Sequence, residues 1–287
     1  MKVLVTADIH FNHPRSRPLA VEQIAQINAM QFDVLLVVGD VAAADDGTLD
    51  ECLGSFTFAG PKLFVAGNHE LWTRGNDSHD LFARVLPQRV AAAGWHWLEG
   101  HPFRHGSVAF VGSIGWYDYS FATDQLEIPR RFYEAKVSPG AAARLEEYAH
   151  LVTGVTDVQP RHLEIVARWN DGRHVKLHRS DELFLQQRLD ELAQSLDQVR
   201  DAAQVIAAVH HVPHRELLPP RRGGSWDFAW AYLGSDRIGE ALLKHRNVSH
   251  IVCGHSHFGH QHRINGVQLI NIGSGYRQKQ VVMLEVA

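Results

Sequence analysis

The stretch VLVTADIH at residues 3–10 is an apolar run that ends in two polar side chains, Asp8 and His10. An almost continuous apolar run of this length predicts a strand that is covered on both faces. The same arrangement returns along the chain, with apolar runs that lead into Gly39-Asp40, Gly67-Asn68-His69-Glu70, His210 and Gly254-His255-Ser256-His257. The sequence therefore predicts buried strands that deliver polar residues at their C-terminal ends.

Between the first two runs, apolar residues recur at helical spacing, at Ala20, Ile24, Ile27 and Met30. A strand–helix–strand unit of this kind predicts that the two strands are parallel. Shorter apolar runs follow at 108–112, 267–272 and 281–286, and we expect them to complete a second, mixed sheet. The predicted fold class is α/β, in which sites form beyond the C-terminal ends of strands.

The segment 118–200 separates the third polar cluster from the fourth, and its pattern is more polar and more helical than the rest. Within it, Ser180 and Asp181 are alternative caps for a helix whose leucines recur at spacings of three and four. We interpret 1–287 as a single domain in which 118–200 is a helical, cap-like insertion. The composition of residues 213–224 is typical of an irregular surface loop.

The composition limits which kinds of binding partner are expected. The 287 residues are 45% apolar, which allows a substantial core, and 28 basic against 32 acidic residues give a net charge of -4. Without a sustained basic run, strong binding to long nucleic acid is not expected. Two cysteines do not indicate a disulfide framework, and we expect neither a signal-type segment nor a membrane-spanning stretch. We expect a cytoplasmic protein that does not associate with a membrane.

The polar clusters combine side chains that bind metals. Asp8 and His10 stand at positions i and i+2, which point the same way in extended backbone, and His255 and His257 repeat that spacing. Imidazole with carboxylate suits Zn, Mn or Fe, and no cysteine accompanies these groups. Each cluster alone is an ordinary turn or cap, but all of them together, in order and after apolar runs, indicate a metal site.

These clusters resemble the ordered motif set of the calcineurin-like metallophosphoesterases. The matching motifs are Asp8-x-His10, Gly39-Asp40, Gly67-Asn68-His69-Glu70, His210-His211 and Gly254-His255-Ser256-His257. They cover nearly the whole chain except the 118–200 segment. The resemblance implies a four-layer αββα sandwich, two mixed sheets flanked by helices, with a binuclear metal centre at one edge.

The resemblance also implies residue roles and cofactors. Two divalent ions are expected, Mn²⁺ first, with Fe and Zn as alternatives. One ion is assigned to Asp8, His10, Asp40 and His257, and the other to Asn68, His210 and His255 with Asp40 shared. His69 is left for proton transfer. Where the family often has Thr-His-His-Pro-Pro, this chain has VHHVP at 209–213, so His210 is taken as the ligand and His211 is the alternative.

The expected reaction is hydrolysis of a small phosphoester by a hydroxide that two metals activate, with His69 protonating the leaving group. The candidate substrate-binding residues are His211, Arg221 and Arg222. Aromatic groups at 116–121 and 226–232 slightly favour phosphodiesters over phosphomonoesters if they line the site, whereas core packing of these aromatics and a solvated arginine pair are the alternatives.

Two other functions stay open at this point. One is a nuclease that acts on short or single-stranded nucleic acid, and the other is a non-catalytic interaction module on the same fold. Because every ligand position and His69 are filled, the sequence favours the enzyme over the module.

Overall fold

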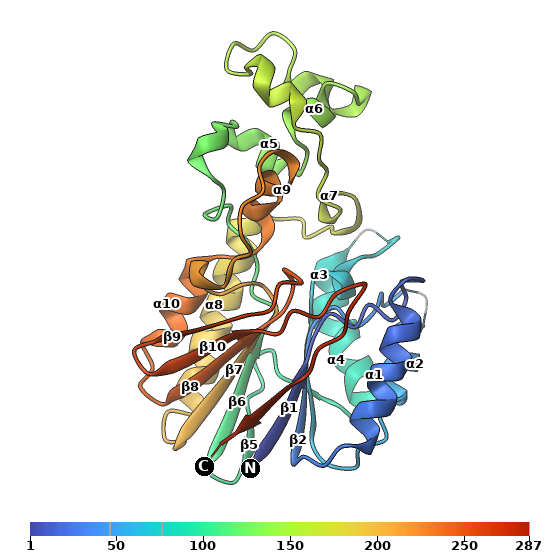
Figure 1. The fold of residues 1–287 in the computed structure, drawn as a ribbon, viewed down its shortest axis with the longest axis vertical. Helices are drawn as coiled ribbons and strands as arrows, with labels where there is room; N and C mark the ends of the chain where they lie inside the picture. Colours follow the sequence, from blue (N-terminus) through green and yellow to red (C-terminus); the bar gives the residue numbers. More distant parts are fainter. Residues whose placement is uncertain (46, 76, 287) are drawn as a thin grey trace.

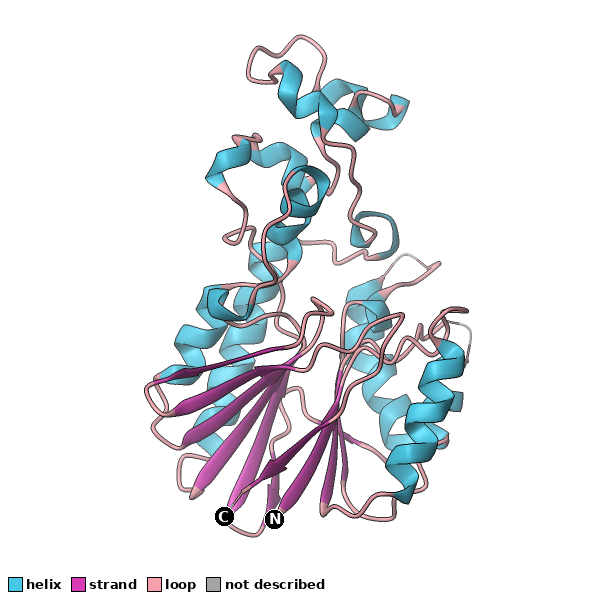
Figure 2. Ribbon diagram, in the orientation of Figure 1, coloured by secondary structure: helices cyan, strands magenta, loops and turns pink. Residues whose placement is uncertain are grey.

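The computed structural model describes residues 1–45, 47–75 and 77–286. Two β-sheets pack face to face, and helices cover the outer face of each sheet (Figure 1 and Figure 2). This arrangement confirms the four-layer sandwich that the resemblance implied. Among the described residues, no helix is both long and apolar enough to cross a bilayer.

The first sheet has the strand order β11-β1-β2-β3-β4. Its strands are β1 Lys2–Thr6, β2 Val34–Val38, β3 Lys62–Val65, β4 His96–Trp97 and β11 Val282–Glu285. Strands β1 to β4 are parallel, as predicted for the first two, and β11 is antiparallel to β1. The expectation that the run at 281–286 joins the second sheet was wrong, because an apolar run does not encode which open sheet edge it will pair with.

The second sheet has the strand order β5-β6-β7-β8-β10-β9. Its strands are β5 Phe103–His105, β6 Val108–Ser113, β7 Gln204–Val209, β8 Val248–Cys253, β9 His260–Ile264 and β10 Val267–Asn271. The four central strands are parallel, and the two edge strands are antiparallel to their neighbours. All C-terminal ends of the parallel strands therefore lie at one edge of this sheet.

Helices cover the sheets on both outer sides. Helices α1 Arg17–Ala29, α2 Thr48–Gly54 and α4 Leu86–Ala92 lie on the first sheet, and α8 Asp181–Gln198 and α10 Asp236–Leu243 lie on the second (Figure 1). The side chain of Ser180 caps α8 by accepting a hydrogen bond from the Leu183 N–H at 3.2 Å. Of the two predicted caps, Ser180 is therefore the one used.

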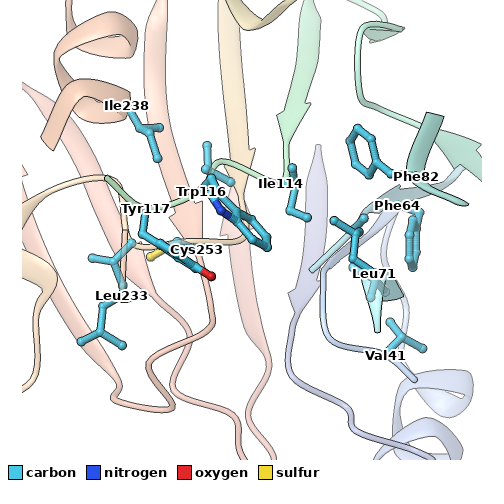
Figure 3. Packing of buried hydrophobic residues seen from close by; sticks show 14 of the residues in the cluster. Val41, Phe64, Leu71, Phe82, Ile114, Trp116, Tyr117, Leu233, Ile238 and Cys253 are labelled. Atoms are coloured by element: carbon cyan, nitrogen blue, oxygen red, sulfur yellow. The ribbon is translucent and has the colours of Figure 1, made fainter. Parts of the chain in front are cut away.

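Alternate residues of the strands face two different cores. Val3 and Val5 belong to the cluster between the two sheets, whereas Leu4 belongs to the larger cluster under the helices. Figure 3 shows part of that larger cluster, in which Trp116 and Tyr117 are fully buried. This burial on both faces explains why the strands are continuously apolar in sequence.

Short helices stand beyond the C-terminal ends of the strands, at the top of Figure 1. They are α5 Arg130–Glu134, α6 Pro139–Ala142 and α7 Asp171–His174 from the 118–200 segment, and α9 Gly224–Ala229. Further short elements are α3 Ser78–Asp80, the π-helical η2 Leu81–Val85, and the 3₁₀ turns η1 His69–Leu71, η3 Asp124–Leu126, η4 Glu146–Leu151, η5 Pro160–Glu164, η6 Arg215–Leu217 and η7 Trp230–Tyr232.

Candidate metal centre

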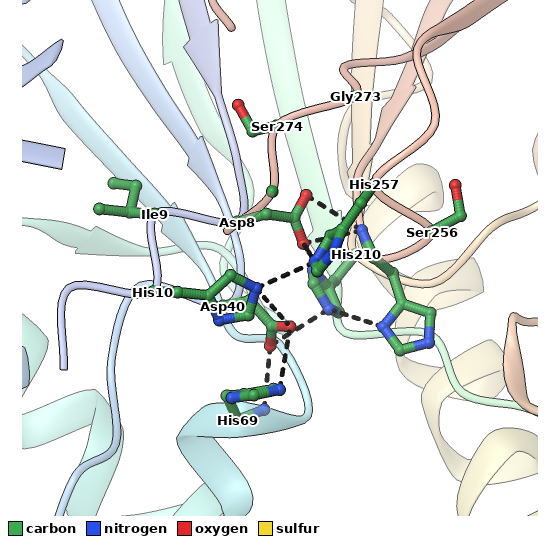
Figure 4. A network of polar contacts seen from close by, with 12 residues as sticks. Asp8, Ile9, His10, Asp40, His69, His210, Ser256, His257, Gly273 and Ser274 are labelled. Atoms are coloured by element: carbon green, nitrogen blue, oxygen red, sulfur yellow. Dashed lines mark hydrogen bonds and ion pairs between the residues drawn. The ribbon is translucent and has the colours of Figure 1, made fainter. Parts of the chain in front are cut away.

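The side chains predicted as ligands converge where the C-terminal ends of the two sheets meet (Figure 4). Asp8 and His10 follow β1, Asp40 follows β2, Asn68 follows β3, His210 follows β7, and His255 and His257 follow β8. All of them are buried except His257, whose side chain is 29% exposed. The structure thus places all seven predicted ligands in one cluster.

The first group of possible ligands consists of Asp8, His10, Asp40 and His257, whose donor atoms lie within 4.8 Å of one another. The Nε2 atoms of His10 and His257 are 3.0 Å apart, and His257 Nε2 is 3.6 Å from Asp8 Oδ1. Atoms bound to one ion at about 2.1 Å are separated by about 3.0 Å at a right angle and about 3.4 Å at a tetrahedral angle. The observed separations are therefore close to those of a metal coordination sphere.

The second group consists of Asp40, His210 and His255. His210 Nε2 lies 3.3 Å from Asp40 Oδ1, 3.2 Å from His255 Nδ1 and 3.3 Å from the amide oxygen of Asn68. Asp40 turns its other oxygen, Oδ2, toward His10 at 3.8 Å. One carboxylate thus presents one oxygen to each group, which is the geometry of a bridging ligand.

Backbone carbonyls orient two of the imidazoles. Nδ1 of His210 is 3.0 Å from the carbonyl oxygen of Val38, and Nε2 of His255 is 3.1 Å from that of Tyr232. A carbonyl oxygen can only accept, so these nitrogens carry hydrogen and donate. The neutral form of each ring then presents the lone pair of its other nitrogen to the cluster, as a metal ligand requires.

Two side chains of the cluster, Asp8 and His210, have raised pKa values and carry protons that a bound cation would displace. Burial raises the pKa of Asp8 to about 8. Burial alone would lower the pKa of His210, but the adjacent Asp40 carboxylate outweighs it and raises that pKa to about 9. Burial lowers the pKa of His257 to about 4, so this ring is neutral near pH 7. Binding of a divalent ion at such a cluster releases protons, and its affinity therefore rises with pH.

Two glycines of the motifs are required by packing against the ligands. A Cβ atom on Gly67 would overlap the Asp40 carboxylate, and one on Gly254 would overlap the Asp8 carboxylate. Gly39 has a different role, because its φ of 76° is a conformation that glycine adopts without steric cost. At Gly67 and Gly254, the absent side chain leaves room for a carboxylate that follows another strand, the neighbouring β2 or β1 of the facing sheet.

The backbone at the ligands is strained. Positive φ values between 45° and 68° occur at Asp8, His10, Asp40, His255 and His257. Residues with a side chain rarely adopt this left-handed conformation, which costs about 1 kcal/mol or more per residue. Strain of this kind clusters at functional sites, where the surrounding structure holds it in place.

The Glu70 carboxylate ties together the loops that carry ligands. It accepts hydrogen bonds of 2.6 to 3.0 Å from the backbone N–H groups of Asp40, Val41, Ala42 and Gly67. These groups belong to the loops after β2 and β3. One buried side chain therefore fixes the relative position of the two loops.

His69 lies beside both groups without belonging to either. Its Nε2 is 3.8 Å from Asp40 Oδ2, and its ring stacks on Trp72 with centroids 3.7 Å apart. The His69 side chain is 13% exposed and faces the cavity above the cluster. A proton on Nε2 can therefore reach a group bound there.

The three candidate substrate-binding residues lie away from this cavity. His211 is fully buried, with Nδ1 2.8 Å from the Ile114 carbonyl oxygen, and burial lowers its pKa to about 3. Arg221 packs over the ring of Trp230 at 4.0 Å, and Arg222 packs over Trp226 at 4.9 Å. None of the three lines the cavity. The two arginines instead hold the tryptophans from outside.

A cavity of about 280 Å³ opens over the cluster. We call it the tryptophan cavity, because its walls include Trp72, Trp169, Trp226 and Trp230 beside Asp40, Asn68, His69, His255 and His257. Residues 226 and 230 are four positions apart in α9 and η7 and share one side, whereas Phe228 and Tyr232 are buried. Only part of the predicted aromatic wall therefore faces the site, and Trp116 and Tyr117 pack in the core.

Sequence reasoning missed Asp171, which the 118–200 segment places beside the cluster. This buried carboxylate accepts hydrogen bonds from Asn68 Nδ2 at 2.8 Å, Trp72 Nε1 at 2.7 Å, Trp169 Nε1 at 2.8 Å and the Tyr117 hydroxyl at 3.1 Å. By holding the amide nitrogen of Asn68, it turns the amide oxygen toward His210. Asn-Asp-Gly at 170–172 is typical of a turn, so the sequence carries no signal for this role.

Such a fold with such a cluster is typical of a metal-dependent hydrolase, and comparison with known families shows the family to which the chain belongs. The profile of the calcineurin-like phosphoesterases matches residues 1–259. The chain belongs to the calcineurin-like phosphoesterase family and is an enzyme, a metallophosphoesterase.

Solved structures share the fold. The phosphopantetheinyl hydrolase of Mycobacterium tuberculosis is similar at 20% identity and a TM-score of 0.68, over 96% of this chain and 90% of that one. A dimetal phosphatase of Danio rerio is similar at 15% identity and a TM-score of 0.53, over 99% of this chain and 91% of that one. No curated protein matches the sequence significantly.

Proposed function

We propose that this enzyme hydrolyses phosphodiesters in slight preference to phosphomonoesters, at a centre of two divalent ions. The observation that carries the proposal is the tryptophan cavity directly over the ligand cluster. A diester brings a second organic group that needs an apolar wall, whereas a monoester dianion favours extra fixed positive charge. The arginine that lines this cavity, Arg168, is paired with Glu147 at 3.0 Å, which supports the diester.

The ions are proposed to be Mn²⁺, with Fe and Zn as alternatives. One is held by Asp8, His10, Asp40 and His257, and the other by Asn68, His210 and His255 with Asp40 shared. When bound, such a pair of ions activates water for attack on phosphorus and offsets charge on the phosphoryl oxygens. The oriented imidazoles and the separations of the donor atoms support this assignment.

His69 is proposed to donate a proton to the leaving oxygen. Its position supports this role, because Nε2 faces the tryptophan cavity and lies outside both ligand groups. Burial lowers the pKa of His69, so its protonated ring releases a proton more readily than an ordinary imidazolium does.

The diester preference is tested with bis-(p-nitrophenyl) phosphate and p-nitrophenyl phosphate under Mn²⁺. After correction for intrinsic reactivity, kcat/KM is expected to be higher for the diester. Trp226→Ala with Trp230→Ala should remove about tenfold from the diester rate and little from the monoester rate, because each ring supplies apolar contact to the second group. A monoester preference that disappears in the variant Arg221→Ala with Arg222→Ala would contradict the proposal.

The natural substrate is to be found with a wider panel. Nucleotides, cyclic nucleotides, short oligonucleotides, phospholipid head groups and a phosphopantetheinyl ester cover the candidates, the last because of the similar solved structure. Turnover of oligonucleotides alone would favour the nuclease, and no turnover with bound metal would favour the interaction module. We further propose a cytoplasmic location, which the two free, buried cysteines support.

A further inference from the structure

A second cavity, of about 680 Å³, adjoins the tryptophan cavity. The two share His69, Trp72, Asn170, His257 and Tyr276, so both open on the candidate metal centre. We call the second one the arginine cavity, because Arg15 and Arg277 lie in its wall. A substrate held at the centre therefore has space on two chemically different sides.

The two arginines are free to meet a ligand. Both are exposed, and among the described residues neither guanidinium has an ion pair or a hydrogen bond. By contrast, Arg17 is paired with Glu51 and Arg89 with Asp50. The described wall of the arginine cavity contains no carboxylate, so its charge is positive without internal compensation.

The loop that carries Arg277 is fixed to the centre. Tyr276 stacks on His10 with centroids 4.3 Å apart, at nearly parallel planes. The ammonium group of Lys279 donates to the carbonyl oxygens of Asp8 at 2.7 Å and Gly275 at 2.9 Å. The backbone beside Arg277 is thus held in a fixed position relative to Asp8 and His10.

We propose that the arginine cavity binds a second anionic group of the substrate, a phosphate on the ester arm that points away from the tryptophan cavity. This inference rests on the proposed diesterase function and names its class of substrate, an asymmetric diester with one apolar arm and one phosphate-bearing arm. Guanidinium groups bind phosphate oxygens through paired, charge-assisted hydrogen bonds. The volume of the cavity suits a whole phosphate group rather than one more oxygen of the reacting phosphoryl.

The kinetic test uses two p-nitrophenyl alkyl phosphodiesters that differ only at the end of the alkyl arm, phosphate in one and methoxy in the other. Arms of graded length locate the best reach, and the common leaving group keeps intrinsic reactivity matched. The phosphate-bearing substrate is expected to have a kcat/KM on the order of tenfold higher. In Arg15→Gln with Arg277→Gln, this preference should disappear while the methoxy substrate keeps its rate.

A matched control is Arg200→Gln with Arg246→Gln. Both residues are exposed and lie just before β7 and β8, at the opposite ends of the strands from the site. The control changes the net charge equally and should keep the preference. A binding measurement completes the test: by calorimetry on the metal-loaded enzyme, an α,ω-alkane bisphosphonate should bind about tenfold tighter than the alkylphosphonate, and only with both arginines present.

The outcomes separate this inference from the proposed function. If wild-type enzyme hydrolyses both substrates with equal kcat/KM, the arginine cavity does not bind phosphate and the diesterase proposal stands. If it hydrolyses neither diester but does hydrolyse monoesters, the diesterase proposal fails. A preference that survives in Arg15→Gln with Arg277→Gln places the second phosphate elsewhere and overturns the inference.

Discussion

Asp40 meets both groups of ligands, and its backbone is strained while doing so. Its Oδ1 also accepts the backbone N–H of His69 at 2.9 Å, so the carboxylate is held by the chain as well as by the neighbouring imidazoles. Its φ is 53°. The carboxylate and the backbone at this position can therefore be tested separately.

Replacing the carboxylate tests the shared ligand. Asp40→Ala is expected to lose tightly bound metal and activity together while the protein stays folded, because both ions depend on this side chain. Metal analysis and circular dichroism of the purified variant check this. Retention of both ions with near-normal turnover would contradict the bridging assignment.

Replacing the residue with glycine tests the backbone strain. In metal-free protein, Asp40→Gly is expected to be more stable than Asp40→Ala by about 1 kcal/mol, because only glycine adopts this φ without a steric cost. Urea unfolding measures the difference. Asn68 is the matched control, since its φ is -67° and its glycine variant should be no more stable than its alanine variant.

The role of His69 is tested through the leaving group. His69→Ala is expected to keep both ions and to lose rate most steeply for alkyl leaving groups, which need a proton, and less for activated aryl groups. A plot of log kcat against leaving-group pKa for both proteins measures this. Equal losses across the series would remove His69 as the proton donor.

At the residue scale, the sequence was informative because each ligand directly follows an apolar run, and parallel strands bring such positions to one edge. His211 was ambiguous, since its neighbour His210 carries the same imidazole and only the direction of each side chain distinguishes them. Arg221 and Arg222 were suggested by charge alone. Their stacking on Trp230 and Trp226 depends on tertiary packing that no local pattern encodes.

At the scale of elements, helix α7 links the insertion to the centre. Asp171 makes the hydrogen bonds described above. In addition, the ring of His174 stacks on Trp72 with centroids 4.8 Å apart, and Trp72 in turn stacks on His69. We propose that 118–200 is an insertion within a single domain, and these contacts support it. The insertion then positions Asn68 and His69.

Asp171→Asn tests this positioning. An amide cannot accept from all of these donors, so Asn68 should lose its fixed orientation and metal affinity should fall about 10- to 100-fold. Metal titration by calorimetry measures the affinity. Tyr117→Phe, which removes one donor to the same carboxylate without touching Asn68, is the control and should change it little. Equal affinities in wild type and Asp171→Asn would contradict the role.

The sequence did not predict how some elements pair or which side their residues share. The strand β11 was predicted, but its partner β1 was not, because pairing at a sheet edge depends on which edge is open after folding. The sequence predicted an aromatic group at 226–232, but the chain is helical there, and the four-residue spacing places Trp226 and Trp230 on the same side. The local sequence thus identified candidate residues more reliably than it predicted their surroundings in the fold.

At the scale of the whole molecule, stability is expected to depend on pH through Glu99. This side chain is 5% exposed, and its Oε1 has no hydrogen-bond partner among the described residues. Burial raises the pKa of Glu99 to about 8, and the nearby Arg188 only partly opposes this. The folded state therefore keeps a proton that the unfolded state releases above its ordinary pKa of about 4.5.

The contribution of Glu99 is fully present below pH 4.5 and is lost as pH rises toward 8. As pH rises between these values, the free energy of unfolding of Glu99→Gln should increase relative to that of wild type, by on the order of 4 kcal/mol at the upper end. Urea unfolding of both metal-free proteins at several pH values gives the difference, in which the other titrating groups cancel. A difference that does not change with pH would show that Glu99 is charged in the folded state.

The position of β1 has a consequence for the order in which a growing chain can fold. On the ribosome, Asp8 and His10 emerge long before His257 and His255, the partners that lie 247 positions later. Strand β1 also keeps one edge unpaired until β11 arrives. Contacts so distant in sequence close slowly. We therefore expect β1 to expose one strand edge until β11 has been made, and the ligand cluster to assemble only after His257 has been translated.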